Sequence, residues 1–227
     1  MNNDFIFRVI GYGADASGAI AQLASLDHDT FDGLQACMAC ECDTTPADNN
    51  RIAVIAAAGN YDDAAATAAE FRRRGIPTVM LATEAVASEA DATAVMPAHD
   101  FARAITILAD MVFRTGPINI DFEDLLTLIQ PGADLRMFEA TGSGYDNPVA
   151  NAVEALDSEI GSEIKLCIKA SIIAVYFNPA TKFKTAQAHA ISQFITGLNP
   201  DIDVKWGLAY DDALPPDTVR ISVIALM

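Results

Sequence analysis

Two aspartates and an asparagine lie within six residues near the middle of the chain. Residues 113–125 read F-R-T-G-P-I-N-I-D-F-E-D-L, in which Asn119, Asp121 and Asp124 are interleaved with apolar side chains. Such groups can position a water or a metal-bound phosphate for hydrolysis. The same spacing also suits a polar loop in which Asp121 or Asp124 caps the next helix, over residues 125–129. Both interpretations remain open from the spacing alone.

The elements around this loop follow from the apolar pattern. Apolar residues of helical period lead up to Gly116-Pro117, which predicts a long helix over residues 98–114. Before it, apolar strands are expected at residues 5–10, 34–42, 51–57, 78–82 and 92–96, and near-continuous apolar runs are typical of a parallel sheet. After it, strands at 169–176, 203–208 and 219–227 and an amphipathic helix at 184–196 indicate a second sheet.

The sequence therefore predicts an α/β fold with three parts. Residues 1–97 form a parallel-sheet domain of nucleotide-binding type, residues 98–115 a central helix, and residues 116–227 an α+β domain with a mixed sheet. The first strand runs into G-Y-G-A-D-A-S-G and then a helical run over 19–26. Backbone amides at Gly11, Gly13 and Gly18 could hold a phosphate there, although a plain strand-to-helix turn needs the same glycines. Asp15 places a negative charge in that turn.

The central loop resembles a known motif. G-P-I-N-I-D-F-E-D-L is similar to G-L-I-N-V-D-F-A-D-V, the synergy loop of FtsZ, the bacterial relative of tubulin. In that family the loop enters the nucleotide pocket of the next subunit in a filament and completes its GTPase site. The resemblance implies a catalytic role for Asn119, Asp121 and Asp124, with GTP or GDP as cofactor and magnesium where a nucleotide binds. It continues to residues 219–226, V-R-I-S-V-I-A-L, which are similar to the family's I-R-V-T-V-I-A-T.

The N-terminal half departs from the family. The tubulin signature G-G-G-T-G-T-G belongs after the third strand, where this chain reads A-A-G-N-Y-D-D and keeps only Gly59, followed by Asn60. Asp62 and Asp63 open the next expected helix, over residues 62–74. Their carboxylates complement the helix dipole at the place where a bound phosphate would otherwise do so. The family's loop and helices between the second and third strands are replaced by a short turn. Its guanine-binding positions fall near Val95 and His99, and neither residue matches.

Composition restricts the partners. The 227 residues carry a formal net charge of −17 and a pI ≈ 4.3, which argues against nucleic acid and direct contact with an anionic membrane. No apolar run approaches the roughly 20 residues that span a bilayer, and the first residues show no signal-peptide pattern. The cluster C-M-A-C-E-C indicates part of a buried strand, with zinc or redox chemistry as the alternative. Free thiols at Cys37, Cys40, Cys42 and Cys167 suit a reducing cytoplasm.

Three function classes are consistent with these observations. The first is an FtsZ/tubulin-like protein that has lost normal GTP binding and acts by association with itself, as a homo-oligomer, or with another tubulin-like protein. The second is an active, polymer-forming GTPase, in which Gly11, Gly13, Gly18, Gly59 and Asn60 would contact the nucleotide and Asp15 or Asp62 would hold magnesium. The third is a small-molecule or dinucleotide-binding module. Whether the chain is an enzyme is left open.

Overall fold

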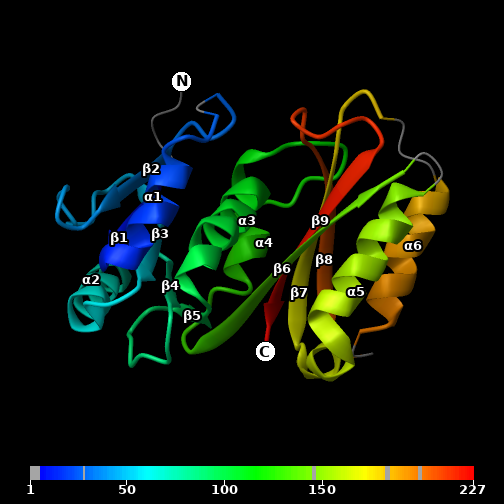
Figure 1. Ribbon diagram of the computed structural model, residues 1–227. Coiled ribbons are helices and arrows are strands. Elements are labelled where there is room, and N and C mark those ends of the chain that lie inside the picture. Colours follow the sequence, from blue (N-terminus) through cyan, green and yellow to red (C-terminus); the bar gives the residue numbers. More distant parts are fainter. Residues whose placement is uncertain (1–5, 28, 145–146, 182–184, 199–200) are drawn as a thin grey trace. The chain divides into compact units, whose positions relative to one another are not determined.

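The computed structural model in Figure 1 describes residues 6–27, 29–144, 147–181, 185–198 and 201–227. Clustering of contacts divides the chain into a first unit, residues 1–113 with 129–135, and a second unit, residues 114–128 with 136–227. The strands are β1 (Ile6–Tyr12), β2 (Leu34–Met38), β3 (Asn50–Ala57), β4 (Thr78–Ala82), β5 (Ala92–Val95), β6 (Ala133–Ser143), β7 (Ala170–Phe177), β8 (Asp203–Tyr210) and β9 (Thr218–Leu226). The helices are α1 (Ser17–Leu23), α2 (Tyr61–Arg73), α3 (Phe101–Phe113), α4 (Phe122–Leu126), α5 (Pro148–Cys167) and α6 (Thr185–Thr196), with short 3-10 turns η1 (Ala14–Ala16) and η2 (Ala98–Asp100).

The first unit contains the parallel sheet that the sequence predicts. Its strand order is β2-β1-β3-β4-β5, and the first residues of β6 pair with β5. All of these pairs are parallel. Residues 52–57 of β3 and the whole of β4 are buried, as expected for strands with helices on both faces. The α/β fold class is confirmed in this unit.

The helices of the first unit lie on opposite faces of its sheet. Successive side chains of a strand point to opposite faces. Ile10 and Tyr12 of β1 share a core cluster with α2, and the Tyr12 hydroxyl lies 2.5 Å from that of Thr67 on α2. Between them, Gly11 faces Ile20 of α1. Consequently α1 covers one face and α2 the other.

Helix α3 packs on the same face as α1. It buries Phe101, Ile105 and Leu108, the apolar positions of the expected helix, and ends before Gly116-Pro117. The ring of Phe113, at its C-terminal end, lies 6.2 Å from that of Phe7 on β1. Because Phe7 and Gly11 point to the same face of β1, α3 and α1 share that face. The start of α3, marked by η2, is therefore placed near the turn that precedes α1.

The second unit contains the mixed sheet that the sequence predicts. Its order is β6-β9-β7-β8, with β7 parallel to β8 and antiparallel to β9. Helices α5 and α6 lie side by side over one face (Figure 1). Their buried residues, among them Leu156 and Phe194, share one core cluster with Val175 and Val223 of the strands. Burial of this apolar surface stabilises the unit independently of any ligand.

Several predicted boundaries shift in the structure. Helix α5 begins at Pro148, with the Asn147 side chain accepting a hydrogen bond from the Ala150 amide at 3.2 Å. The second strand, predicted over residues 34–42, ends at Met38, because the chain turns there instead of continuing along β1. Phe5 and Lys184, with which a predicted strand and a predicted helix begin, lie outside the described residues.

Candidate functional site

The carboxyl edge of the first sheet is the place where its order predicts a ligand. In open α/β sheets, ligands bind beyond the carboxyl ends of neighbouring strands whose connections leave to opposite faces. Strand β1 continues into α1 on one face, and β3 continues into α2 on the other. The predicted contacts Gly11, Gly13, Gly18, Gly59 and Asn60 all follow or end these two strands. The structure therefore brings the two glycine turns to one edge.

The two turns pack directly against each other. Ala58 donates a backbone hydrogen bond to the Tyr12 carbonyl at 2.8 Å, so β1 and β3 stay paired up to the turns. A Cβ placed on Gly13 would lie 1.9 Å from the carbonyl oxygen of Ala58, and Gly13 has φ 85. Only glycine combines that dihedral with so close a backbone approach. Gly13 is therefore required for the contact between the turns, whatever else binds there.

Gly11 and Gly18 have different surroundings. A Cβ on Gly11 would lie 2.8 Å from both Ile20 Cγ1 and Met38 Sδ, so its lack of a side chain lets α1 and β2 approach β1. Gly18, in α1, has no atom within 4 Å of such a Cβ. The two glycines that the sequence groups together thus differ. Gly11 allows α1 and β2 to pack closely on β1, and Gly18 faces open space.

Two hollows flank the contact between the turns, one on each face of the sheet. The first, of about 830 Å³, is lined by Asp15, Gly18 and Gln22 beside α1 and by Ala98 and His99 at the start of α3. It joins the glycine turn to His99, near which the resemblance to FtsZ puts a guanine-binding position that this chain does not match. The second, of about 480 Å³, lies on the α2 side, where its lining includes Tyr12, Cys40, Thr44, Asn60 and Asp63.

The charge of this edge is negative. Asp15 opens η1, and Asp62 and Asp63 lie in the first turn of α2, where carboxylates complement the helix dipole. Asn60 precedes α2 in the left-handed conformation, with φ 51, and its side chain makes no capping hydrogen bond. Among the described residues that line the two hollows, none is a lysine or an arginine. A nucleotide phosphate here would need a cation to offset these carboxylates.

The central loop belongs to the second unit and forms a helix cap. Asp121 precedes α4, and its Oδ1 accepts a hydrogen bond from the Asp124 amide at 2.7 Å. Asp124 Oδ2 in turn accepts from the Asp121 amide at 3.2 Å, which completes a capping box. The Oδ1 of Asn119 accepts from the Gly116 amide at 2.8 Å. The capping interpretation is thus confirmed for Asp121, with the helix starting at Phe122 instead of residue 125.

A lysine that the sequence analysis did not single out fixes one of these carboxylates. Lys205 Nζ, on β8, lies 3.1 Å from Asp124 Oδ1. Partial burial raises the pKa of Asp124, but the Asp121 amide and the Lys205 ammonium outweigh it, and the net pKa is lowered. Hydrogen bonding and attraction to Asp124 raise the pKa of Lys205. A single cation in the acidic run D-I-D-V-K was the only sequence signal for this contact.

The backbone of the loop is seated on strand β8. Ile118 and Leu208 form an antiparallel bridge, in which the Leu208 amide donates to the Ile118 carbonyl at 2.8 Å. A Cβ on Gly116 would lie 2.3 Å from the Leu208 carbonyl oxygen, and one on Gly207 would lie 2.8 Å from that of Ile118. Asn119 and Asp121 remain exposed. The loop is therefore fixed in position while two of its polar side chains face outward.

Buried charges hold the first residue of this loop. Arg114 Nη1 lies 3.2 Å from Asp211 Oδ1, and Arg220 Nη2 lies 2.9 Å from Asp211 Oδ2. Arg220 also pairs with Glu139 at 2.8 Å and stacks on the ring of Tyr176. These residues are far apart in the sequence and carry no local motif, so sequence reasoning missed them. Their pairing balances the buried Asp211 and the half-buried Glu139 against two guanidinium groups.

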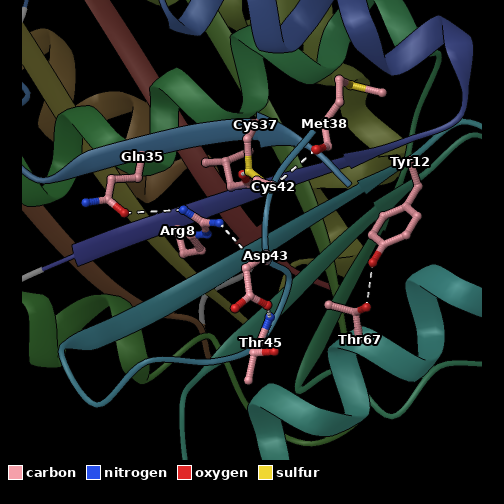
Figure 2. The surroundings of a disulfide bond; sticks show 10 residues. Arg8, Tyr12, Gln35, Cys37, Met38, Cys42, Asp43, Thr45 and Thr67 are labelled. Atoms are coloured by element: carbon pink, nitrogen blue, oxygen red, sulfur yellow. Dashed lines mark hydrogen bonds between the residues drawn. A yellow bond between two sulfur atoms is a disulfide. The ribbon is translucent and has the colours of Figure 1, made fainter. Parts of the chain in front are cut away.

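The cysteine cluster differs from its prediction. Cys37 lies on β2, and a turn after Met38 brings Cys42 back to it, with Cα atoms 6.3 Å apart, and the two form a disulfide (Figure 2). The prediction of free thiols is wrong for this pair, because the strand that was expected to separate the two residues ends at Met38. Cys40 and Cys167 are free and exposed. Among the described residues, no three histidine, cysteine or carboxylate side chains converge as metal ligands.

No protein-family model matches the chain. Cell division protein FtsZ 1 of Archaeoglobus fulgidus is 25% identical over 122 residues, which make up 54% of this chain and 33% of that protein. An empty FtsZ dimer of M. jannaschii matches with a TM-score of 0.74 at 16% identity, over 98% of this chain and 88% of that one. The chain is FtsZ/tubulin-like.

The fold of the FtsZ-like chain is also similar to that of TubZ. TubZ of Bacillus thuringiensis serovar israelensis, in GDP-form protofilaments, matches with a TM-score of 0.65 at 10% identity, over 97% of this chain and 85% of that one. At these identities the structural matches establish the FtsZ/tubulin-like fold. The sequence match spans only about a third of the curated FtsZ. None of the described helices in the FtsZ-like chain is long and apolar enough to cross a membrane.

Proposed function

We propose that this FtsZ/tubulin-like protein has lost normal GTP binding and acts by association, with itself or with another tubulin-like protein. The observation that carries the proposal is the contact between the two glycine turns. Gly13 lies against the Ala58 carbonyl, where no space for a phosphate remains between them. Asp15, Asp62 and Asp63 add negative charge on both sides. A triphosphate would meet protein backbone and three carboxylates.

The central loop supports the proposal that the protein acts by association. Its backbone is fixed by β8, its helix is capped, and Lys205 fixes Asp124. Asn119 and Asp121 are exposed, so a partner can reach them. A loop ordered in this way loses little conformational entropy when it docks, which favours association. We infer that Asn119, Asp121 and Asp124 are offered to the pocket of a neighbouring subunit.

The assemblies of similar proteins also support association. The M. jannaschii FtsZ structure is a dimer, and the TubZ structure contains protofilaments. The curated relative is a cell division protein. We place this chain in the same class of assembling proteins, in the cytoplasm, with a role in cell division as the first process to examine. Its formal net charge of −17 argues against nucleic acid and anionic lipid as partners.

One observation favours a second candidate, an active nucleotide hydrolase. The hollow of about 830 Å³ joins Asp15 and Gly18 to His99, and its volume suits a nucleoside. In that case the base would enter beside α3, and a magnesium ion held by Asp15 would offset the carboxylate charge. Retention of a stoichiometric nucleotide through purification would support this candidate over the first.

Sedimentation velocity tests the association directly. The protein is examined over a range of concentrations, alone and mixed with an active FtsZ, with the GTPase rate of the mixture recorded. We expect concentration-dependent association, or a changed GTPase rate of the FtsZ. Asp121→Asn is the variant of choice, because asparagine caps a helix about as well as aspartate but lacks the charge. A monomer at all concentrations, with no effect on FtsZ, would refute the proposal.

Wild-type behaviour of Asp121→Asn would show that the carboxylate is not used by the partner. A matched control is Glu123→Gln, which removes a carboxylate from the first turn of the same helix but from a position outside the capping box. We expect this control to associate as the wild type does. The comparison separates a general change of loop charge from the loss of one carboxylate.

A further inference from the structure

The turn that follows β2 lies beside the candidate site and is closed by a disulfide. After Met38 the chain reverses, with the Glu41 amide donating to the Met38 carbonyl at 2.9 Å. This reversal brings Cys42 next to Cys37, five residues earlier in the chain, and the two form the disulfide. Both are half-buried, and β2 is at the edge of its sheet. A reductant can therefore approach this disulfide from solvent.

Both oxidation states have a place in the fold. Cys37 Sγ lies 3.9 Å from the Val9 carbonyl oxygen, and Cys42 Sγ lies 3.3 Å from that of Met38. In the dithiol form each S–H can donate to its carbonyl, so reduction leaves no buried thiol without an acceptor. The disulfide closes a very short loop, and short loops constrain the unfolded chain least. Reduction therefore acts on the turn and leaves the fold of the unit in place.

The turn forms one wall of the second hollow. Cys40 and Thr44 line it from the turn, facing Asn60 and Asp63 at the start of α2. Besides the disulfide, the turn is held by backbone hydrogen bonds, in which the Ala39 amide donates to the Gly11 carbonyl and the Glu41 amide to that of Met38. Arg8 Nη2 donates to the Asp43 carbonyl at 2.9 Å (Figure 2). The disulfide is the covalent cross-link of the turn, from Cys42 inside it to Cys37 on β2. Reduction of the disulfide therefore allows the turn to move, while the hydrogen bonds of Ala39 and Asp43 still hold its two ends.

We propose that Cys37 and Cys42 form a reversible redox site whose substrate is a dithiol, and that reduction reshapes the hollow around Cys40, Asn60 and Asp63. One thiolate of the dithiol attacks a sulfur of the Cys37–Cys42 bond, and a mixed disulfide forms as that bond breaks. The second thiol displaces the protein sulfur. The dithiol is oxidised by two electrons to its disulfide, and Cys37 and Cys42 end as thiols with two protons. In a reducing compartment the dithiol form prevails, and oxidation restores the disulfide that closes the turn.

The test uses the full chain as Cys40→Ser/Cys167→Ser, which leaves only the paired cysteines. The protein is equilibrated in buffers of oxidised and reduced dithiothreitol, alkylated and weighed by mass spectrometry. We expect no alkyl group in the oxidised protein and two in the reduced protein, with recovery on reoxidation. Two alkyl groups under all conditions would overturn the proposal. A disulfide in the wild type between Cys40 and either neighbour would also overturn it.

Hydrogen–deuterium exchange provides the structural readout. Amides of residues 40–44 should exchange several-fold faster after reduction, while those of Ala39, β3 and β4 should keep their rates. Cys37→Ser/Cys42→Ser should exchange like the reduced protein, with rates that dithiothreitol does not change. Equal exchange of residues 40–44 in both oxidation states would refute the coupling of the disulfide to the hollow. None of these readouts depends on nucleotide or on association, so the inference is tested independently of the proposed function.

Discussion

Replacing Gly13 by alanine is the sharpest test of how the two glycine turns are built. The backbone of Gly13 has φ 85 and ψ 154, a region that is nearly exclusive to glycine. An alanine Cβ would also lie 1.9 Å from the Ala58 carbonyl oxygen and 2.5 Å from its carbon. Neither atom can move away easily, because both are backbone at the end of β3. The turn or the strand end must shift.

The magnitude follows from these two effects. A residue forced into a glycine-only region costs about 1–3 kcal/mol. Forcing an extra methyl group into a packed site costs typically about 1–3 kcal/mol more. We therefore expect Gly13→Ala to lower the free energy of unfolding by at least about 2 kcal/mol. For a chain of this length that loss lowers the melting temperature by at least roughly 4 °C.

Gly18→Ala is the matched control. Gly18 lies five residues further on, in α1, and a Cβ there meets nothing within 4 Å. Alanine is the better helix former, so this variant should gain about 0.5 kcal/mol. Urea unfolding followed by circular dichroism measures both. A Gly13→Ala protein that unfolds at the wild-type urea concentration would show that the turns are not in contact, and the argument against a phosphate site would fail.

Three further tests, two of them with a matched control substitution, address the loop and its supports. Asp121→Ala should cost about 1 kcal/mol in urea unfolding through loss of the cap, whereas Asp121→Asn should be near neutral; equal losses would contradict the cap. Because the pKa of Asp124 is lowered in the folded protein, its carboxylate stabilises the fold above the unfolded pKa of 3.8, and this stability is lost as the pH falls further. Because the pKa of Lys205 is raised, its ammonium stabilises the fold below the unfolded pKa of 10.5, and this stability is lost as the pH rises further. Lys205→Gln should therefore weaken the pH dependence of the melting temperature below about pH 4 and above about pH 10.5. An unchanged pH profile would exclude the pair. Arg220→Met removes the cation beside half-buried Glu139 and one of the two guanidinium groups that pair with buried Asp211, and it should cost about 1–3 kcal/mol. The exposed Glu70→Gln should cause no measurable loss when both are followed by thermal unfolding.

Much of the fold was predictable because its signals are local. The continuous apolar runs of β3 and β4 indicate strands buried on both faces, and both were predicted to within one residue. The helical period before Gly116-Pro117 similarly gave α3. The end of β2 was missed because Ala39 and Cys40 continue a pattern compatible with a strand. The structure ends β2 at Met38 because the following turn folds back on Cys37.

The candidate site was predictable in its parts and not in its geometry. Gly13 and Gly59 could be found by residue type, since strand-to-helix turns favour glycine. Their contact depends on the pairing of β1 with β3, which no local pattern records. Asp121 as a helix cap followed from spacing, whereas the pairing of Asp124 with Lys205 joins positions 81 residues apart in the sequence. Long-range contacts of this kind require the tertiary structure.

Calorimetric titration with GTP and with GDP, in the presence of magnesium, tests the central claim most directly. We predict no heat of binding for either nucleotide up to millimolar concentration, because the contact of Gly13 with Ala58 and the charge of the flanking carboxylates oppose a phosphate at this edge. Saturable binding of a guanine nucleotide would contradict it. Asp121 and Asp124 would then be the first residues to replace in a turnover assay.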